Sequence, residues 1–178
     1  MKKTTLGIVA LLFCASASAE DFYLGLARAT PGEAYADFAQ AKQVRNYNSP
    51  AAYLISGGYH WSEQLGAELG YGGFGTWKMA DPTPGSKQTY QLSTSVLYAA
   101  VTSRMEFSNG LGVFGKLGLA RNRYAFPTET VTTIRPMLGF GTSYAITKNL
   151  AAKLEYNYFG NTGKGTQEKA ALGLSYGF

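Results

Sequence analysis

The chain of 178 residues has few of the residues on which several protein classes depend. It contains one cysteine and one histidine, which excludes a disulfide-stapled secreted domain and a usual zinc site. No later segment supplies the roughly 20 mostly apolar residues of a membrane-spanning helix. The net charge of +5 is too mild to indicate nucleic acid as a partner. No cofactor is expected.

The first residues have the pattern of a secretory signal. A charged start, Met1–Lys3, precedes the apolar run Leu6–Phe13 and the small residues Ala17–Ala19. We therefore predict a signal peptide over residues 1–19 and a mature domain over residues 20–178. The only cysteine, Cys14, lies inside the signal after the bulky Phe13, which argues against a lipoprotein anchor.

Glycine and aromatic residues are abundant, with 22 Gly, 13 Tyr and 10 Phe, a composition that favours strands and tight turns. The last nine residues alternate strictly, since Ala170, Leu172, Leu174, Tyr176 and Phe178 share one face of a strand. The opposite face carries only small residues. This pattern is typical of a strand whose apolar side meets lipid, and the mean hydropathy of −0.11 agrees with a chain in which alternate residues are apolar.

The same period of two predicts eight strands in one domain. They are Phe22–Arg28, Ala52–Trp61, Leu65–Gly75, Thr89–Met105, Leu111–Arg121, Val131–Ile146, Leu150–Phe159 and Ala170–Phe178. Each has an apolar face, which in the fourth strand is assigned to Tyr90, Leu92, Val96, Tyr98 and Ala100. We therefore predict an all-β fold, an eight-stranded antiparallel up-and-down transmembrane barrel.

The connections alternate in length. Short turns are expected at Ser62–Gln64, Glu106–Gly110 and Thr147–Asn149, and longer polar links at Ala29–Ala51, Thr76–Gln88, Asn122–Thr130 and Gly160–Gln167. Short periplasmic turns and long extracellular loops are typical of outer-membrane barrels, which predicts that both termini lie in the periplasm. Pro136 falls inside a strand, so we expect a bulge or the true start of pairing there.

The face opposite the apolar one carries charges of both signs and many glycines. Its charged residues are Glu68, Lys116, Arg135, Lys153 and Glu155. On lipid, each Lys or Arg near the bilayer centre would cost roughly 2 to 4 kcal/mol, whereas the same groups can pair inside a narrow lumen. We therefore predict that this face is the interior. The strand ends carry aromatic residues suited to the interfaces, Trp61, Tyr144, Tyr176 and Phe178 on the periplasmic side and Trp77, Tyr90 and Tyr158 on the outer side.

Several segments together resemble the transmembrane domain of the OmpA-type outer-membrane protein family. They are Gly66–Tyr71, Gly115–Gly118, Ser143–Thr147, Lys153–Tyr156 and Leu172–Tyr176. The resemblance implies a salt-bridged interior that includes Glu68, Lys116, Lys153 and Glu155. It also implies insertion by the barrel-assembly machinery, with Gly173, Tyr176 and Phe178 as the assembly signal. Since the sequence stops after the barrel, we expect a stand-alone member without a peptidoglycan-binding domain.

Three functions are consistent with this reading. The first is a structural and surface-interaction protein of the outer membrane, whose loops bind an external ligand and whose Arg121 and Arg123 pair with lipopolysaccharide phosphates. The second is a narrow porin-like channel for small solutes or apolar molecules. The third is a lipid A-modifying enzyme that would use His60 and Ser62, although these lie beside a periplasmic turn, in the leaflet opposite lipid A. We expect no catalytic residues.

Overall fold

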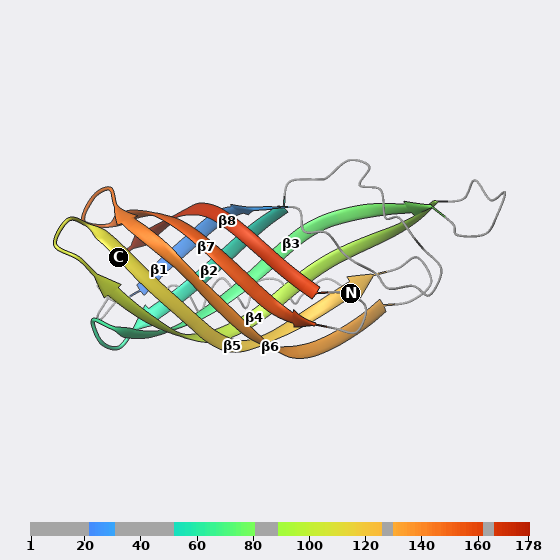
Figure 1. Cartoon of the computed structure of the whole chain (residues 1–178), viewed down its shortest axis with the longest axis horizontal. Helices are drawn as coiled ribbons and strands as arrows, with labels where there is room; N and C mark the ends of the chain where they lie inside the picture. The colour runs from blue at the N-terminus through green and yellow to red at the C-terminus, as the bar shows by residue number, and fades with distance from the viewer. Residues whose placement is uncertain (1–21, 31–51, 81–88, 126–129, 162–165) are drawn as a thin grey trace, which may run out of the picture.

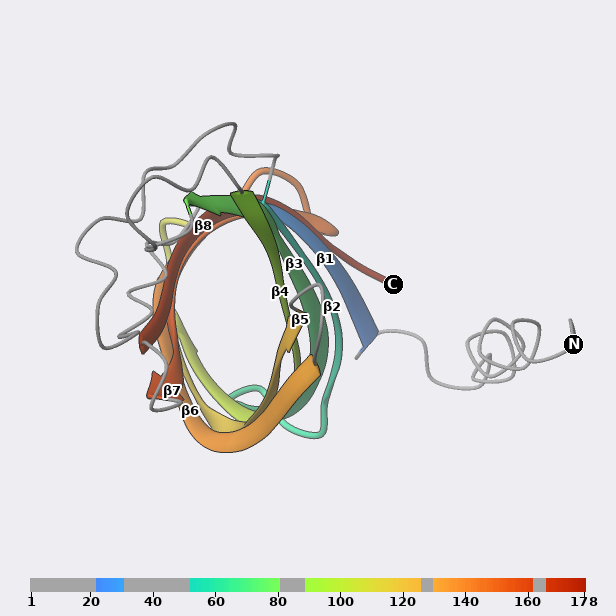
Figure 2. The ribbon, with the colours of Figure 1, turned by 90° about the vertical axis from the view of Figure 1, so that its right-hand side faces the viewer.

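The computed structural model describes residues 22–30, 52–80, 89–125, 130–161 and 166–178, and within them the strands form a closed antiparallel barrel. The strands are β1 (Phe22–Ala29), β2 (Ala52–His60), β3 (Leu65–Ala80), β4 (Thr89–Glu106), β5 (Leu111–Ala125), β6 (Thr130–Ala145), β7 (Leu150–Asn161) and β8 (Thr166–Gly177). Each pairs with the next, and β8 pairs with β1. Viewed along its axis, the barrel is a closed ring (Figure 2). The predicted fold class is confirmed.

The two ends of the barrel differ. The turn end, on the left of Figure 1, carries the short connections 61–64, 107–110 and 146–149. At the other end, here called the loop end, lie the strand ends Ala29, Ala80, Ala125 and Asn161. At the turn end, side chains complete the turns: Ser62 Oγ accepts the Leu65 N–H, and Thr147 Oγ1 accepts the Leu150 N–H. The predicted signal peptide lies outside the described residues.

Strands β3 to β6 extend further toward the loop end than the other four (Figure 1). The third strand was expected to end at Gly75, but this residue has a φ of 84° and lies at a register shift, after which β3 continues to pair with β4. Strands β5 and β6 pair as far as Ala125 opposite Thr130. The connection between them is therefore shorter than expected, and so is the one after β7.

The bulky apolar row faces outward on seven strands, as predicted, with Leu69, Leu117 and Leu172 each about 60% exposed. The assignment for β4 was wrong. Val96, Tyr98 and Ala100 are buried in the lumen, and Leu97, Val101 and Met105 face outward. Both faces of β4 are apolar, so its alternation alone could not decide its orientation. The side chains of Trp77, Tyr90 and Leu92 lie outside the described set.

Pro136 marks the true start of pairing on one side of β6. Pairing with β5 continues through Pro136 opposite Leu119, whereas pairing with β7 begins only at Leu138 opposite Tyr158. Beyond Tyr158 the pairing of β7 with β8 shifts in register and resumes at Asn161 opposite Thr166, and at this bulge the Phe159 carbonyl accepts a hydrogen bond from Asn122 Nδ2 on β5. Gly160, with a φ of 88°, permits the bulge. Among the described residues, no helix is long and apolar enough to cross a membrane.

Candidate functional site in the barrel lumen

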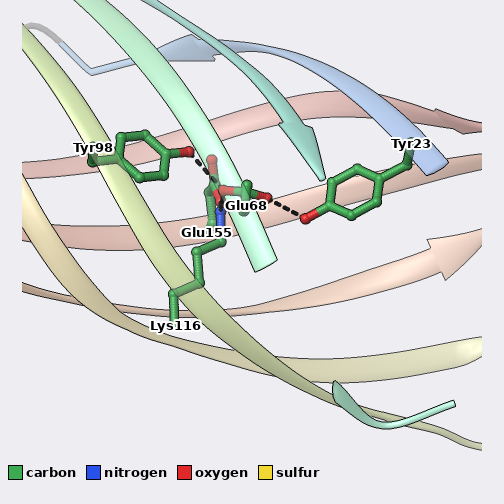
Figure 3. Close-up of polar contacts among 5 residues, drawn as sticks. All are labelled: Tyr23, Glu68, Tyr98, Lys116 and Glu155. Carbon is green, nitrogen blue, oxygen red and sulfur yellow. Dashed lines mark hydrogen bonds and ion pairs between the residues drawn. The ribbon is translucent and has the colours of Figure 1, made fainter. Parts of the chain in front are cut away.

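A buried lysine joins two glutamates across the lumen (Figure 3). Lys116 Nζ on β5 lies 2.6 Å from Glu68 Oε1 on β3 and 2.6 Å from Glu155 Oε2 on β7. Their side chains are between 1% and 6% exposed. Removing one member of such a group would leave an uncompensated buried charge. The three strands are therefore linked through the middle of the barrel.

Two tyrosines donate further hydrogen bonds to the Glu68 carboxylate. Tyr23 on β1 donates to Glu68 Oε2 at 2.7 Å, and Tyr98 on β4 donates to Glu68 Oε1 at 2.6 Å (Figure 3). Each ring lies over a glycine: a Cβ on Gly58 would be 2.3 Å from the Tyr23 ring, and one on Gly70 would be 2.3 Å from the Tyr98 ring. The absence of side chains at these two positions makes room for both rings.

Lys153 lies next to this group but is held differently. Its Nζ lies 4.4 Å from the centre of the Tyr23 ring and 5.4 Å from that of Phe114, both within cation–π range. A cavity of about 10 Å³, lined in part by Glu68, Lys116, Lys153 and Glu155, adjoins the group. This volume holds about one water molecule. We call these four charged residues, with Tyr23 and Tyr98, the lumen network.

An apolar layer fills the lumen on the loop-end side of the network. The ring of Phe159 lies 5.8 Å from that of Phe74 and 5.7 Å from that of Tyr98, and Met137 is fully buried in the same cluster. We call Phe74, Tyr98, Met137 and Phe159 the aromatic plug. Phe159 shares the inward alternation of Glu155 and Asn157 on β7, which places its ring in the plug.

The structure brings together four of the five charged residues expected in the interior, Glu68, Lys116, Lys153 and Glu155. Including Arg135 was wrong. Arg135 is exposed at the loop end, two residues beyond the buried Met137, where β6 has no β7 partner. Sequence reasoning missed Tyr23 and Tyr98. The alternation of β1 could have found Tyr23, since its neighbours Phe22 and Leu24 face outward.

The other sequence-predicted residues lie on the outer wall or at the seam between the first and last strands. Arg121 and Arg123 are exposed on β5 toward the loop end. At the seam, Gly173 packs against β1 so closely that a Cβ there would lie 2.3 Å from the Leu26 carbonyl oxygen. Tyr176 and Phe178 are half exposed, with their rings edge-on at 5.3 Å. The role of these three as an assembly signal stays a prediction.

The residues of the enzyme alternative have structural contacts. His60 stacks on Tyr23 with ring centres 4.9 Å apart, and Ser62 Oγ accepts the backbone N–H of Leu65 in the adjacent turn. Within the ranges described above, no three His, Cys, Asp or Glu side chains are grouped so as to hold a metal ion.

Comparison with known proteins identifies the family. The model of the outer membrane protein beta-barrel domain matches residues 6–178. The chain belongs to this outer-membrane barrel family. Its most similar curated relatives include outer membrane protein P5 of Haemophilus influenzae, which is 26% identical over 99% of the chain. The chain spans about half of that relative, 56% of its length. The expected membership of an OmpA-type outer-membrane family is confirmed.

Solved structures agree with this fold. The N-terminal β-barrel domain of Pseudomonas aeruginosa OprF has a TM-score of 0.58 at 16% identity and covers 89% of this chain and 98% of that one. The attachment invasion locus protein Ail of Yersinia pestis, solved in complex with the heparin analogue sucrose octasulfate, has a TM-score of 0.55 at 12% identity. It covers 89% of this chain and 97% of that one. At these identities the likeness concerns the fold alone.

Proposed function

We propose that this protein is a closed outer-membrane barrel that acts as a structural and surface-interaction protein through its loop end. The filled lumen carries this proposal. The lumen network crosses the barrel with side chains at most 6% exposed in its Lys116, Glu68 and Glu155 members, and the aromatic plug lies directly beyond it. An eight-stranded barrel has room inside only for its own side chains. Interactions with other molecules then fall to the outer surface and the loops.

The same proposal sets the orientation of the barrel in the outer membrane. The turn end, where the described strands begin at Phe22 and end at Gly177, faces the periplasm, and the loop end faces outward. The half-exposed aromatic residues Trp61, Tyr144 and Tyr176 support this, because they lie at the turn end where an interfacial belt is expected. A protease-accessible tag placed in the 30–51 connection would be cut on intact cells, and a tag after Phe178 would not.

Arg121 and Arg123 would then face the phosphates of lipopolysaccharide. Both are exposed on the outer wall of β5, and within the described part of the chain neither guanidinium group forms a side-chain hydrogen bond or an ion pair. Guanidinium groups bind phosphates and sulfates in a bidentate manner. The complex of the similarly folded Ail with sucrose octasulfate supports an anionic partner.

A double variant tests this contact. Arg121→Gln with Arg123→Gln should lower both the lipopolysaccharide that co-purifies with the barrel and the binding of sucrose octasulfate. The matched control is Lys148→Gln, an exposed lysine in a short turn at the opposite end. Equal amounts of co-purified lipopolysaccharide in the double variant and the control would remove these arginines from the proposal.

The narrow channel remains the second candidate, favoured by the charged lining and the small cavity of the lumen network. The two functions differ in planar bilayers. A plugged barrel leaves the membrane silent, whereas a channel gives stable, reproducible conductance steps that change in the Lys116→Met variant. The barrel is proposed to have no catalytic activity, and an unchanged lipid A acylation pattern on His60→Ala is the matching expectation.

A further inference from the structure

The outward face of β1 changes from apolar to charged unusually close to the turn end. Its outward residues are Phe22, Leu24 and Leu26, which are 38% to 61% exposed, followed by the exposed Arg28. The Arg28 guanidinium group forms no side-chain hydrogen bond or ion pair with another described residue. Arg28 lies between Tyr53 on β2 and Leu172 on β8, and both of these also face outward. The guanidinium group therefore stands on the lipid-facing wall.

The opposite flank has a much longer apolar row. On β5, the outward positions from Leu111 to Leu119 are apolar or glycine, and the first charge is Arg121. At about 3.3 Å per residue and a tilt of about 40°, the distance from Leu111 to Arg121 corresponds to roughly 25 Å along the barrel axis. The distance from Phe22 to Arg28 corresponds to roughly 15 Å. The apolar band of outer-membrane barrels is about 25 Å tall, so only the β5 flank matches it.

The strands beside Arg28 show that the charge lies within the apolar band. Leu172, its partner on β8, is 63% exposed, and Ala170 and then Glu168 follow it toward the loop end. Glu168 already has a partner, since it accepts a hydrogen bond from the Tyr156 hydroxyl. An arginine on the lipid face is destabilising in a depth-dependent way unless its charge reaches a polar partner. Snorkelling of the side chain covers only part of the distance.

We propose that Arg28 binds the phosphate of an outer-leaflet lipid headgroup and draws it toward the barrel, so that the membrane is locally thinner along the β8–β1 flank than along the β5 flank. The small Ala170 leaves space on the wall directly above Leu172 for such a headgroup. Phosphate is the group that a guanidinium binds in a bidentate manner. Lipid A and phospholipids both supply it, and the experiment distinguishes them.

Depth-dependent quenching tests the proposal on the full chain in which Cys14→Ser removes the native thiol. A fluorophore is attached at Leu172→Cys or at Leu117→Cys, both the fourth outward position from the turn end on their strands. The barrels are placed in vesicles of brominated phosphatidylcholine, prepared with and without lipopolysaccharide. The phosphatidylcholine acyl chains carry bromine either near the headgroup (shallow) or near the bilayer centre (deep). We expect the Leu172 label to be quenched at least twofold more by shallow than by deep bromine, and the Leu117 label to show the reverse.

In the Arg28→Leu variant, the label at position 172 should be quenched more by deep than by shallow bromine. In the Arg121→Leu variant, its quenching should not change. If shallow bromine quenches the label at position 172 more strongly in vesicles of phosphatidylcholine alone, the partner of Arg28 is the phosphate of any lipid headgroup. If this happens only when lipopolysaccharide is present, the partner is lipid A. Equal depths for the two labels in both kinds of vesicle would overturn the proposal. If the labels at positions 172 and 117 no longer differ in depth in the Glu168→Gln variant, the proposal is also overturned, because Glu168 rather than lipid would then be the partner of Arg28.

Discussion

Replacing Lys116 with Met should be the most damaging single change in the lumen. Lys116→Met keeps most of the side-chain volume but removes the one charge that lies between Glu68 and Glu155. At an effective dielectric constant of about 20, opposite unit charges at the observed 2.6 Å attract by roughly 6 kcal/mol. Desolvation of the three groups offsets much of this attraction. The variant loses both ion pairs, and among the described residues Lys153 beside the two carboxylates forms no ion pair that replaces them, so the buried carboxylates should cost about 3 to 5 kcal/mol.

The assay is urea unfolding in vesicles, with the folded fraction read from gel mobility in dodecyl sulfate without boiling, because closed barrels resist this detergent until heated. A control, Lys148→Met, changes an exposed lysine of a turn and should stay within about 0.5 kcal/mol of the native chain.

A second comparison separates charge from packing. Adding Glu68→Gln, Glu155→Gln and Lys153→Met to Lys116→Met removes all four charges of the lumen network and should restore most of the lost free energy of unfolding, since uncharged groups of similar volume replace buried ion pairs at little cost. A loss below 1 kcal/mol in Lys116→Met, or a quadruple variant no more stable than the single one, would refute the assigned role of the network.

Three further changes in the interior, one of them with a matched control, can be measured by the same unfolding assay. Tyr98→Phe removes a 2.6 Å hydrogen bond to charged Glu68 and should cost about 1.5 to 3 kcal/mol, and an unchanged free energy of unfolding would contradict this bond. Gly70→Ala pushes a methyl group into the Tyr98 ring and should cost about 1 to 3 kcal/mol. Gly115→Ala, where the nearest atom is 3.9 Å away, should be nearly neutral, and equal effects would contradict the packing argument. Phe159→Ala should cost about 3 to 5 kcal/mol through the cavity it leaves in the aromatic plug.

Most of the fold was predictable because seven of the eight strands place contrasting residues on their two faces. The eighth strand shows this well, with Leu172 and Leu174 on one face and Gly173 and Ser175 on the other. Strand β4 has no such contrast. Val96 and Leu97 are equally apolar, and only the packing of Tyr98 against Phe159 and Glu68 decides which face is the interior.

The site was predictable to a lesser degree. Alternation placed Glu68, Lys116, Lys153 and Glu155 on the inner face. A period of two does not, however, tell how far along the barrel axis a residue lies. Arg135 has the interior alternation and yet is exposed beyond the plug, because β6 pairs with β7 only from Leu138 onward. That limit lies beside the register shift at Phe159 and Gly160 of β7, which no local pattern encodes.

The lumen network also has a kinetic consequence. Its residues come from β1, β3, β4, β5 and β7, and its hydrogen bonds join positions 30 to 48 residues apart. Tyr98 and Glu68 lie on neighbouring strands, whereas the contacts of Tyr23 with Glu68 and of Lys116 with Glu68 and Glu155 each join strands that are not neighbours. These three contacts need the curvature of the closed sheet. We therefore expect them to form late in folding and to slow unfolding of the closed barrel more than they speed its formation.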